Sequence, residues 1–104
     1  MLSATYATIN AAMESRLQIT CSYQGHDREI CFHSIGYGKD GGEKALGFQF
    51  AGSSSKGLPI GGQWRCMDLA QLSNVQPRTG SWYSGTDHGK PQTCVKDVHY
   101  EVMG

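Results

Sequence analysis

The chain has 104 residues, with nine Lys and Arg, nine Asp and Glu, and a formal net charge of zero. This length suits one domain with a single core, so we expect residues 1–104 to fold as one unit. Zero net charge provides no overall field that would draw the protein to nucleic acid or to a membrane surface. No stretch approaches the roughly 20 apolar residues of a membrane-spanning helix.

Basic residues are nevertheless concentrated in one part of the chain. Residues 44–96 hold six of the nine, against only Asp68 and Asp87. The six are Lys44, Lys56, Arg65, Arg78, Lys90 and Lys96. This local excess suits a small anionic ligand better than a nucleic-acid duplex, whose binding usually neutralises several phosphates at once.

The first 17 residues have neither the basic start nor the dense apolar run of a secretory signal. Without export, the four cysteines are expected to be reduced thiols rather than two disulfides. The expected location is therefore the cytoplasm.

A helix is predicted over about residues 3–16, because apolar residues recur there at helical spacing and Ser3 or Thr5 can serve as its cap. The chain then changes to a period of two. The expected hairpin consists of strands 17–23 and 28–33 and a turn at 24–27. In its second strand Ile30 and Phe32 are expected to face inward, and Cys31 and His33 outward.

The remaining expected elements are a turn at 34–43, strands at 44–51 and 63–69, a long loop at 52–62, a polar segment at 78–93 and a closing strand at 98–102. Leu46, Phe48 and Phe50 share one face of the third strand. Gly47 between them indicates tight curvature or a close backbone approach.

After the fourth strand, Leu69, Leu72 and Val75 step by three, which is typical of a short helical turn or a bent strand that Pro77 ends. The short alternating runs, the 14 glycines and the five tyrosines together favour a mainly β class. We therefore predict a small SH3/Sm-like β-barrel over about residues 17–102, with the short N-terminal helix packed against it.

This order of elements resembles the WYL domain, a small Sm/SH3-like β-barrel of bacterial regulators. The stretch AAMESRLQITCSYQGHDREICFHSIG is similar to the opening of that family: a short helix, a strand ending in Tyr, a turn and an Arg-containing strand. Residues 32–35 stand at its Pro-x-x-Leu step without the proline. Of its Trp-Tyr-Leu triplet only Leu46 is kept.

Arg65 to Leu72 is similar to the Arg-x-Phe-x-Leu-x-Arg-Ile segment of the family, where Arg65 matches the first arginine and Gln71 replaces the second. The resemblance covers about residues 9–76 and implies a regulatory module whose basic ligand pocket is only partly kept. Family members usually follow a helix-turn-helix domain. A role in transcription would therefore need a separate DNA-binding partner.

The candidate ligand site is centred on Arg65. Its guanidinium offers a planar fork to a carboxylate, a phosphate or a nucleic-acid end, with Trp64 expected as an aromatic wall beside it. The alternative is a surface salt bridge from Arg65 to Asp68 or another neighbour. Lys56 and the serines around Ser54 would add an anion-holding loop, unless that loop is simply solvated.

Arg78, Trp82 and Tyr83 form a second candidate surface, on which a base or another planar ligand would stack. Alternatively, the aromatic pair caps the open end of the barrel. The same pair, or the barrel edge, would also serve a protein-interaction or self-association module, so a homo-oligomer remains an open alternative.

Individual residues would also suit a zinc site or an enzyme. Cys31 and His33 would supply two zinc ligands, completed by Cys66, Cys94 or His88, but there is no Cys-x-x-Cys pair of the kind that structural zinc sites use. Cys31 with His33, or Ser84 with His88, would supply a nucleophile and a base. No nucleophile elbow, phosphate loop or pair of carboxylates accompanies them, so no enzyme, metal or cofactor is predicted.

Overall fold

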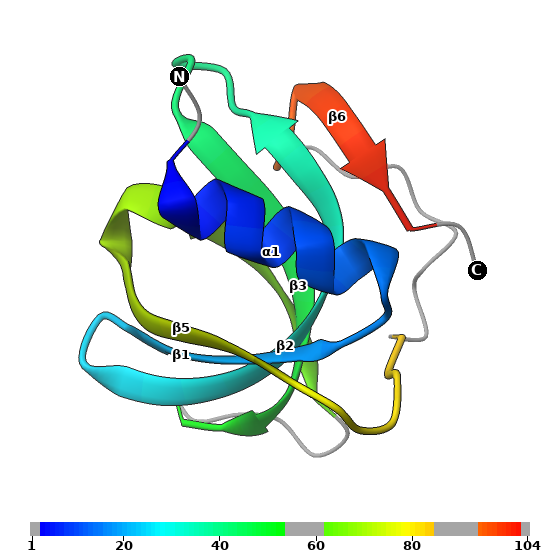
Figure 1. The fold of residues 1–104 in the computed structure, drawn as a ribbon. Helices are drawn as coiled ribbons and strands as arrows, with labels where there is room; N and C mark the ends of the chain where they lie inside the picture. The colour runs from blue at the N-terminus through cyan, green and yellow to red at the C-terminus, as the bar shows by residue number, and fades with distance from the viewer. Residues whose placement is uncertain (1–2, 54–61, 85–93, 103–104) are drawn as a thin grey trace.

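The computed structural model describes residues 3–53, 62–84 and 94–102. Its elements are α1 (Ala4–Glu14), β1 (Gln18–Tyr23), β2 (His26–Tyr37), β3 (Glu43–Gly52), β4 (Gln63–Asp68), the 3₁₀ turn η1 (Leu69–Gln71), β5 (Leu72–Arg78) and β6 (Asp97–Glu101). The predicted mainly β class with one short N-terminal helix is confirmed. An antiparallel six-stranded sheet curls beneath α1 (Figure 1).

The helix α1 begins directly after Ser3, one of the two predicted caps. The Ser3 hydroxyl oxygen accepts a hydrogen bond from the Tyr6 amide at 3.1 Å, and Glu43 on β3 accepts one from the Ser3 amide at 2.9 Å. Ile9 and Met13 are fully buried, because helical spacing places both on the face that contacts β5, β2 and β1. The helix is thereby fixed to the sheet at its first turn and along one face.

The connection between β4 and β5 shows why the sheet curls. The strand order is β4-β3-β2-β1-β5, so these two strands are four steps apart. In a flat sheet they would be separated by about 19 Å, at about 4.8 Å per step. Yet η1 alone joins them, and three residues of 3₁₀ helix rise only about 6 Å. The sheet therefore bends round into a barrel, and the Tyr23 hydroxyl on β1 accepts a hydrogen bond from the Asp68 amide at 3.4 Å.

The strand β2 is longer than predicted, because it pairs with two strands along one edge. Its first half pairs with β1, and residues 34–37 pair with β6 while β3 pairs along the other edge. A register shift between Phe32 and Ser34 bends the strand where it changes partner. The turn predicted at 34–43 is consequently reduced to residues 38–42.

The face of β3 that lines the core carries small side chains. Ala45 belongs to the core, and a Cβ atom added at Gly47 would lie 2.4 Å from Cγ2 of Ile30 and 2.9 Å from the Phe32 ring. The close approach predicted at Gly47 is thus present. The large apolar residues of this strand lie on its opposite face. They are Leu46, Phe48 and Phe50.

A second apolar layer covers that opposite face. Trp64 on β4 packs edge-on against Phe48, with ring centroids 5.3 Å apart. Tyr83 stacks on Phe50 at 4.5 Å. Tyr83 belongs to residues 79–84, which we call the strap because this segment crosses the outer face of β2. The barrel therefore has apolar material on both sides of β3.

Beneath the strap, Cys31 and His33 point away from the core as predicted, but they are buried rather than exposed. The Cys31 sulfur accepts a hydrogen bond from the Tyr83 amide at 3.4 Å, and the His33 Nε2 lies 3.0 Å from the Tyr83 carbonyl oxygen. Local alternation indicates the face on which a residue lies. It does not reveal that a distant segment covers this face.

Two predictions need correction. Cys66 and Cys94 form a disulfide, so the expectation of reduced thiols fails for this pair, whereas Cys21 and Cys31 are free. The fold brings the two Cα atoms to 5.5 Å although they are 28 residues apart, which spacing alone does not indicate. Pro77 lies within β5 opposite Ile19 and does not end the strand, because an edge strand tolerates a missing amide proton.

Among the described residues, no helix combines the length and the apolar character needed to cross a membrane.

Candidate functional site

Three polar side chains meet on the inner face of the barrel. Arg28 on β2 is two residues before the core residue Ile30, and Arg65 on β4 is two residues before the core residue Met67. Gln49 follows Gly47 on β3 at the same spacing. Because side chains two positions apart share a face of a strand, all three point inward. We call Arg28 and Arg65 the arginine pair.

Both guanidinium groups of the arginine pair donate to one oxygen atom. Arg28 Nη1 lies 3.1 Å and Arg65 Nε lies 3.2 Å from Oε1 of Gln49. The Gln49 Nε2 donates to the carbonyl oxygens of Ala51 and Ser53, each at 3.1 Å. A flipped amide would direct its N–H groups at two cations and its oxygen at two carbonyl oxygens, so these contacts determine the orientation of the amide.

Arg28 is a buried cation whose positive charge is little offset by its described neighbours. It is 4% exposed, its Nε has no hydrogen-bond partner, and no carboxylate of the described residues forms an ion pair with it. Its guanidinium lies over the Tyr23 ring, 5.2 Å from the centroid. Burial, and then the charge of Arg65, lower the pKa of Arg28. Arg28 thus faces a second cation, and a nearby anion would offset this repulsion.

The residues of this cluster differ in their exposure to solvent. Arg65 and Tyr23 are each half-buried, whereas Arg28 and Gln49 are fully enclosed. The predicted alternative for Arg65 is a salt bridge to Asp68 or another neighbour, and Asp68 pairs with Lys44 at 3.8 Å.

Trp64 does not form the expected aromatic wall beside Arg65. Consecutive residues of a strand point to opposite faces, so the Trp64 ring lies in the outer layer, 4.9 Å from the His33 ring. Trp82 also lies in this layer, 4.9 Å from the same ring, and it packs against the core. Tyr83 is already stacked on Phe50. The proposed stacking surface is therefore largely occupied by the protein itself.

Arg78 lies apart from the arginine pair. It forms an ion pair with Glu29, and its Nε donates to Oε1 of Gln18 at 2.9 Å. Of the other predicted ligand-site residues, Ser54 and Lys56 lie outside the described residues. The structure therefore keeps Arg65 within a cluster and separates Trp64, Arg78 and Trp82 from it.

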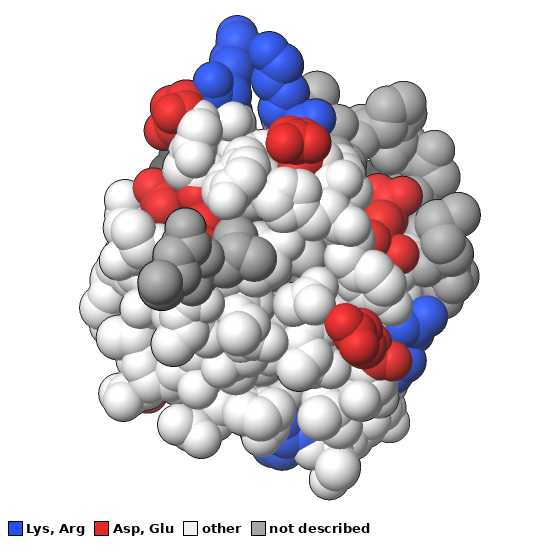
Figure 2. All heavy atoms as spheres, turned by 45° about the horizontal axis from the view of Figure 1, so that its top comes forward, with Lys and Arg blue, Asp and Glu red and all other residues white. Residues whose placement is uncertain are grey.

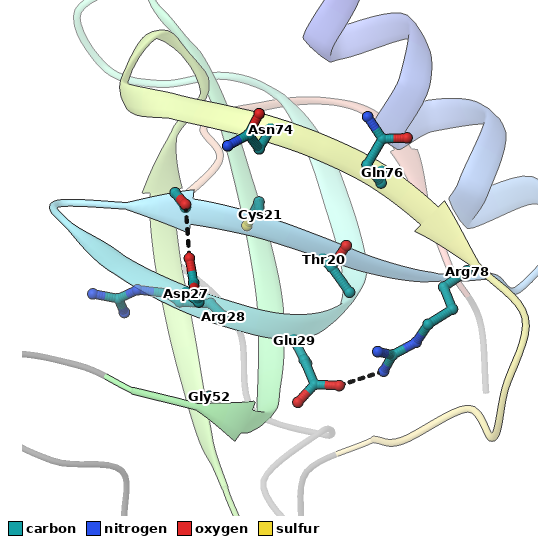
Figure 3. Close-up of a pocket in the computed structure, with 10 residues that line it drawn as sticks. Thr20, Cys21, Asp27, Arg28, Glu29, Gly52, Asn74, Gln76 and Arg78 are labelled. Atoms are coloured by element: carbon teal, nitrogen blue, oxygen red, sulfur yellow. Dashed lines mark hydrogen bonds and ion pairs between the residues drawn. The ribbon is translucent and has the colours of Figure 1, made fainter.

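A pocket of about 450 Å³ lies over β1, β2 and β5 (Figure 3). It is lined by Thr20, Cys21, Ser22, Asp27, Arg28, Glu29, Gly52, Asn74, Gln76 and Arg78. In Figure 3 the Arg28 guanidinium extends away from Arg78. Asp27 accepts a hydrogen bond from Ser22 at 2.9 Å, and Glu29 pairs with Arg78. Arg28, a member of the arginine pair, also lines this pocket.

The positions of the cysteines bear on the metal and nucleophile interpretations. No three His, Cys, Asp or Glu side chains of the described segments group as metal ligands, and the disulfide occupies Cys66 and Cys94. His88 lies outside the described residues. Burial raises the pKa of Cys31. A thiol that keeps its proton is a poor nucleophile.

Arg28 and Gln49 are the site residues that sequence analysis missed. A signal for Arg28 exists, because it alternates with Ile30 and Phe32 and so occupies an inward position of a predicted strand. Gln49 gives no comparable signal, since the face of β3 that it shares is defined by the small residues Ala45 and Gly47.

Comparison of the chain with family models, with curated proteins and with solved structures gives no match. The fold and the cluster define a small mainly β protein with a paired-arginine site. The resemblance to the WYL domain stays a prediction.

Proposed function

We propose that this protein is a small regulatory module that binds an anionic ligand at the arginine pair. The observation that carries the proposal is the convergence of two guanidinium groups, one of them on a 4% exposed residue, on a single neutral oxygen. A carboxylate or phosphate group in this position would accept hydrogen bonds from both arginines. It would also offset their mutual repulsion.

The charge distribution favours a small ligand over a long nucleic acid. On the face shown in Figure 2, the described Lys and Arg side chains form a small group at the top beside acidic ones and otherwise lie near the lower edge, without a continuous basic patch. A polyanion binds through many basic contacts at once, whereas a small anion needs only one such pair. We propose a metabolite with a carboxylate or phosphate group, and the terminal phosphate of a nucleic acid strand is the comparison ligand.

The regulatory role rests on the resemblance to the WYL domain, and so do the bacterial setting and the separate DNA-binding partner to which binding would be communicated. For the location of the protein, we propose a compartment in which the Cys66–Cys94 disulfide persists. Such a compartment is more oxidising than the cytoplasm first expected.

The test is thermal unfolding in the presence of phosphate, citrate, nucleotides and 5′-phosphorylated oligonucleotides. A ligand present at about 100 times its Kd stabilises the folded state by about 2.7 kcal/mol, which raises the Tm of a domain this small by several degrees. We expect at least one anion to do so for the wild type. We expect Arg65→Ala to remove the shift while the variant still folds.

Arg78→Ala is the matched control, because Arg78 is an arginine engaged with Glu29 and Gln18 away from the pair. It should keep the full shift. Equal losses in both variants, or an undiminished shift in Arg65→Ala, would contradict the proposal. Light scattering over a concentration series separates ligand binding from self-association, which remains the competing function for the exposed Tyr83 and Val98.

A further inference from the structure

We propose that the strap is a cover that opens while the barrel stays folded, and that it thereby controls access to the Cys31 thiol. The strap lies over Cys31 and His33, which are 0% and 3% exposed. Opening would give the protein a second conformation, in which this part of the outer face of β2 meets solvent. The arginine pair has no part in this motion, because it lies on the inner face of the barrel.

The strap is held to the barrel without strand pairing. Within the described part of the chain, none of its backbone groups bonds to another backbone group. Instead, the Ser81 carbonyl oxygen accepts a hydrogen bond from Gln18 Nε2 at 2.7 Å, and the Tyr83 backbone contacts the Cys31 sulfur and the His33 ring. Contacts to side chains can break without disturbing the hydrogen bonds between strands. The strap can therefore leave while the sheet remains intact.

One buried group of the strap would gain from opening. The Trp82 Nε1 is buried and has no hydrogen-bond partner among the residues that the structure describes. A buried donor without an acceptor costs free energy, which contact with water would recover. The stacking of Tyr83 on Phe50 acts in the opposite direction and favours the closed position. All other residues of the strap are exposed, so opening sacrifices little further burial.

Gln18 fixes the start of the strap. Its Oε1 accepts hydrogen bonds from Arg78 Nε at 2.9 Å and from Arg78 Nη2 at 2.6 Å, while its Nε2 donates to Ser81. A Cβ atom added at Gly80 would lie 2.6 Å from this Nε2. Because Gln18 is buried and bonded at both ends of its amide, it cannot turn aside easily. A larger residue at position 80 would therefore displace the strap.

The closed strap keeps Cys31 unreactive in two ways. It covers the sulfur atom, and burial raises the pKa of the thiol, although the Tyr83 amide and the charge of Arg78 lower it. The thiolate, and not the thiol, attacks a disulfide. Cys31 should therefore react from the open conformation, so the rate of its reaction measures how often the strap opens.

The experiment follows Cys31 in the full-length Cys21→Ala variant, where it is the only free thiol because Cys66 and Cys94 form the disulfide. The probe is the aromatic disulfide dithiobis(nitrobenzoate) in excess. The Cys31 thiol gives its proton to the buffer, and the thiolate attacks one sulfur of the probe to form a mixed disulfide. The other half of the probe leaves as a coloured thiolate, which absorbance measures.

We expect Cys31 in this background to react at least about tenfold faster than global unfolding allows, with little dependence on low concentrations of denaturant. The free energy and the rate of global unfolding come from denaturation of the same variant. Labelling that matches global unfolding in both rate and denaturant dependence would overturn the proposal, because the strap would then open only together with the barrel.

Gly80→Ala, added to this background, tests whether the strap itself controls the reaction. We expect labelling to become about tenfold faster, because the new methyl group overlaps the Gln18 amide. Gly42→Ala is the matched control, since a Cβ there meets only the Asp40 carboxylate, and it should label at the background rate. Equal rates in the two variants would contradict the proposal.

Tyr83→Ala decides the question if Gly80→Ala does not fold. It removes the stack on Phe50 and keeps the backbone contacts to Cys31 and His33, so it should also speed labelling. An unchanged rate in folded Tyr83→Ala would count against the strap as the cover.

Discussion

Gly47 is a position at which one missing side chain determines how a whole strand packs. The sequence predicts a close approach there, and the structure identifies the partners as Ile30 and Phe32 on the adjacent strand. Because β3 carries only Ala45 and Gly47 opposite them, these two large side chains fill this part of the core.

We expect Gly47→Ala to destabilise the protein by about 1–3 kcal/mol, since its new methyl group would overlap Ile30 Cγ2 and force the core to shift. Chemical denaturation measures the change. Gly42→Ala is the control, because the nearest atom to a Cβ there is the flexible Asp40 carboxylate at 3.3 Å. Similar losses in both variants would contradict this account of Gly47.

The buried thiol of Cys21 predicts a specific dependence on pH. Burial raises the pKa of Cys21 to about 11, the charge of Arg28 opposes this rise, and that of Asp27 adds to it. In the unfolded chain the thiol loses its proton near its ordinary pKa of about 8.5. The stability contributed by the protonated thiol is thus complete below this pH and is lost as the pH rises towards 11.

We therefore expect the wild type to lose more unfolding free energy between about pH 8.5 and about pH 11 than Cys21→Ala does. Tyr6, whose pKa is also raised by burial, is present in both proteins, so its contribution cancels in the comparison. Denaturation curves at several pH values provide the measurement. Parallel pH profiles for the two proteins would show that the thiol titrates alike in both states.

At the scale of the elements, β4 is held both by strand pairing and by a covalent bond. It pairs with β3 on one side, and Cys66 joins it through the disulfide to Cys94, just before β6. Lys96 then donates from its amide to the Tyr37 carbonyl oxygen at 3.0 Å, which continues the connection to β2. The covalent bond thus fixes the strand that carries Arg65.

Removal of this disulfide should destabilise the fold by about 3–4 kcal/mol, the chain-entropy value for a loop closed across 28 residues. We expect the wild type to unfold at lower denaturant concentration when reductant is present. The Cys66→Ser/Cys94→Ser double variant should unfold at one concentration with or without reductant. A reductant effect in that variant would assign the loss to something other than this bond.

Elements defined by local pattern were predicted well, and those defined by distant pairing were not. The helix, its Ser3 cap, the first hairpin and the closing strand follow from periodicity and turn residues. The extension of β2 to Tyr37 depends on β6, more than 50 positions later in the chain, and the strap over Cys31 depends on residues 79–84. The local sequence pattern does not predict these long-range contacts.

The candidate site shows the same division. Arg65 was predicted from its residue type and its position in a strand. The residues that surround Arg65 were not predicted. Trp64 was expected beside it because the two are adjacent in sequence, but the alternation of side chains along a strand places the Trp64 ring on the opposite face. Arg28 and Gln49 reach Arg65 only because β2, β3 and β4 lie side by side, so the cluster is a property of the sheet.

For the whole molecule, the curl of the sheet decides what lies inside. The mainly β class and the helix on the barrel were predictable, since composition and alternation both indicate them. Which face of β3 turns inward was not, because its apolar side chains favour the face that the strap and the β4 aromatic residues cover. The protein has enough apolar side chains for two layers. The pairing register of β2, β3 and β4 determines which layer each apolar side chain joins.

The two apolar layers have a consequence for how this protein can diverge. Most of the middle of β3 is enclosed, whereas nearly all of β5 after Leu72 faces water. Substitutions in an enclosed strand disturb close packing on one side or the other, while exposed positions usually tolerate exchange. Related chains should therefore retain the pattern of small and large residues in β3 even where the sequence of β5 has diverged.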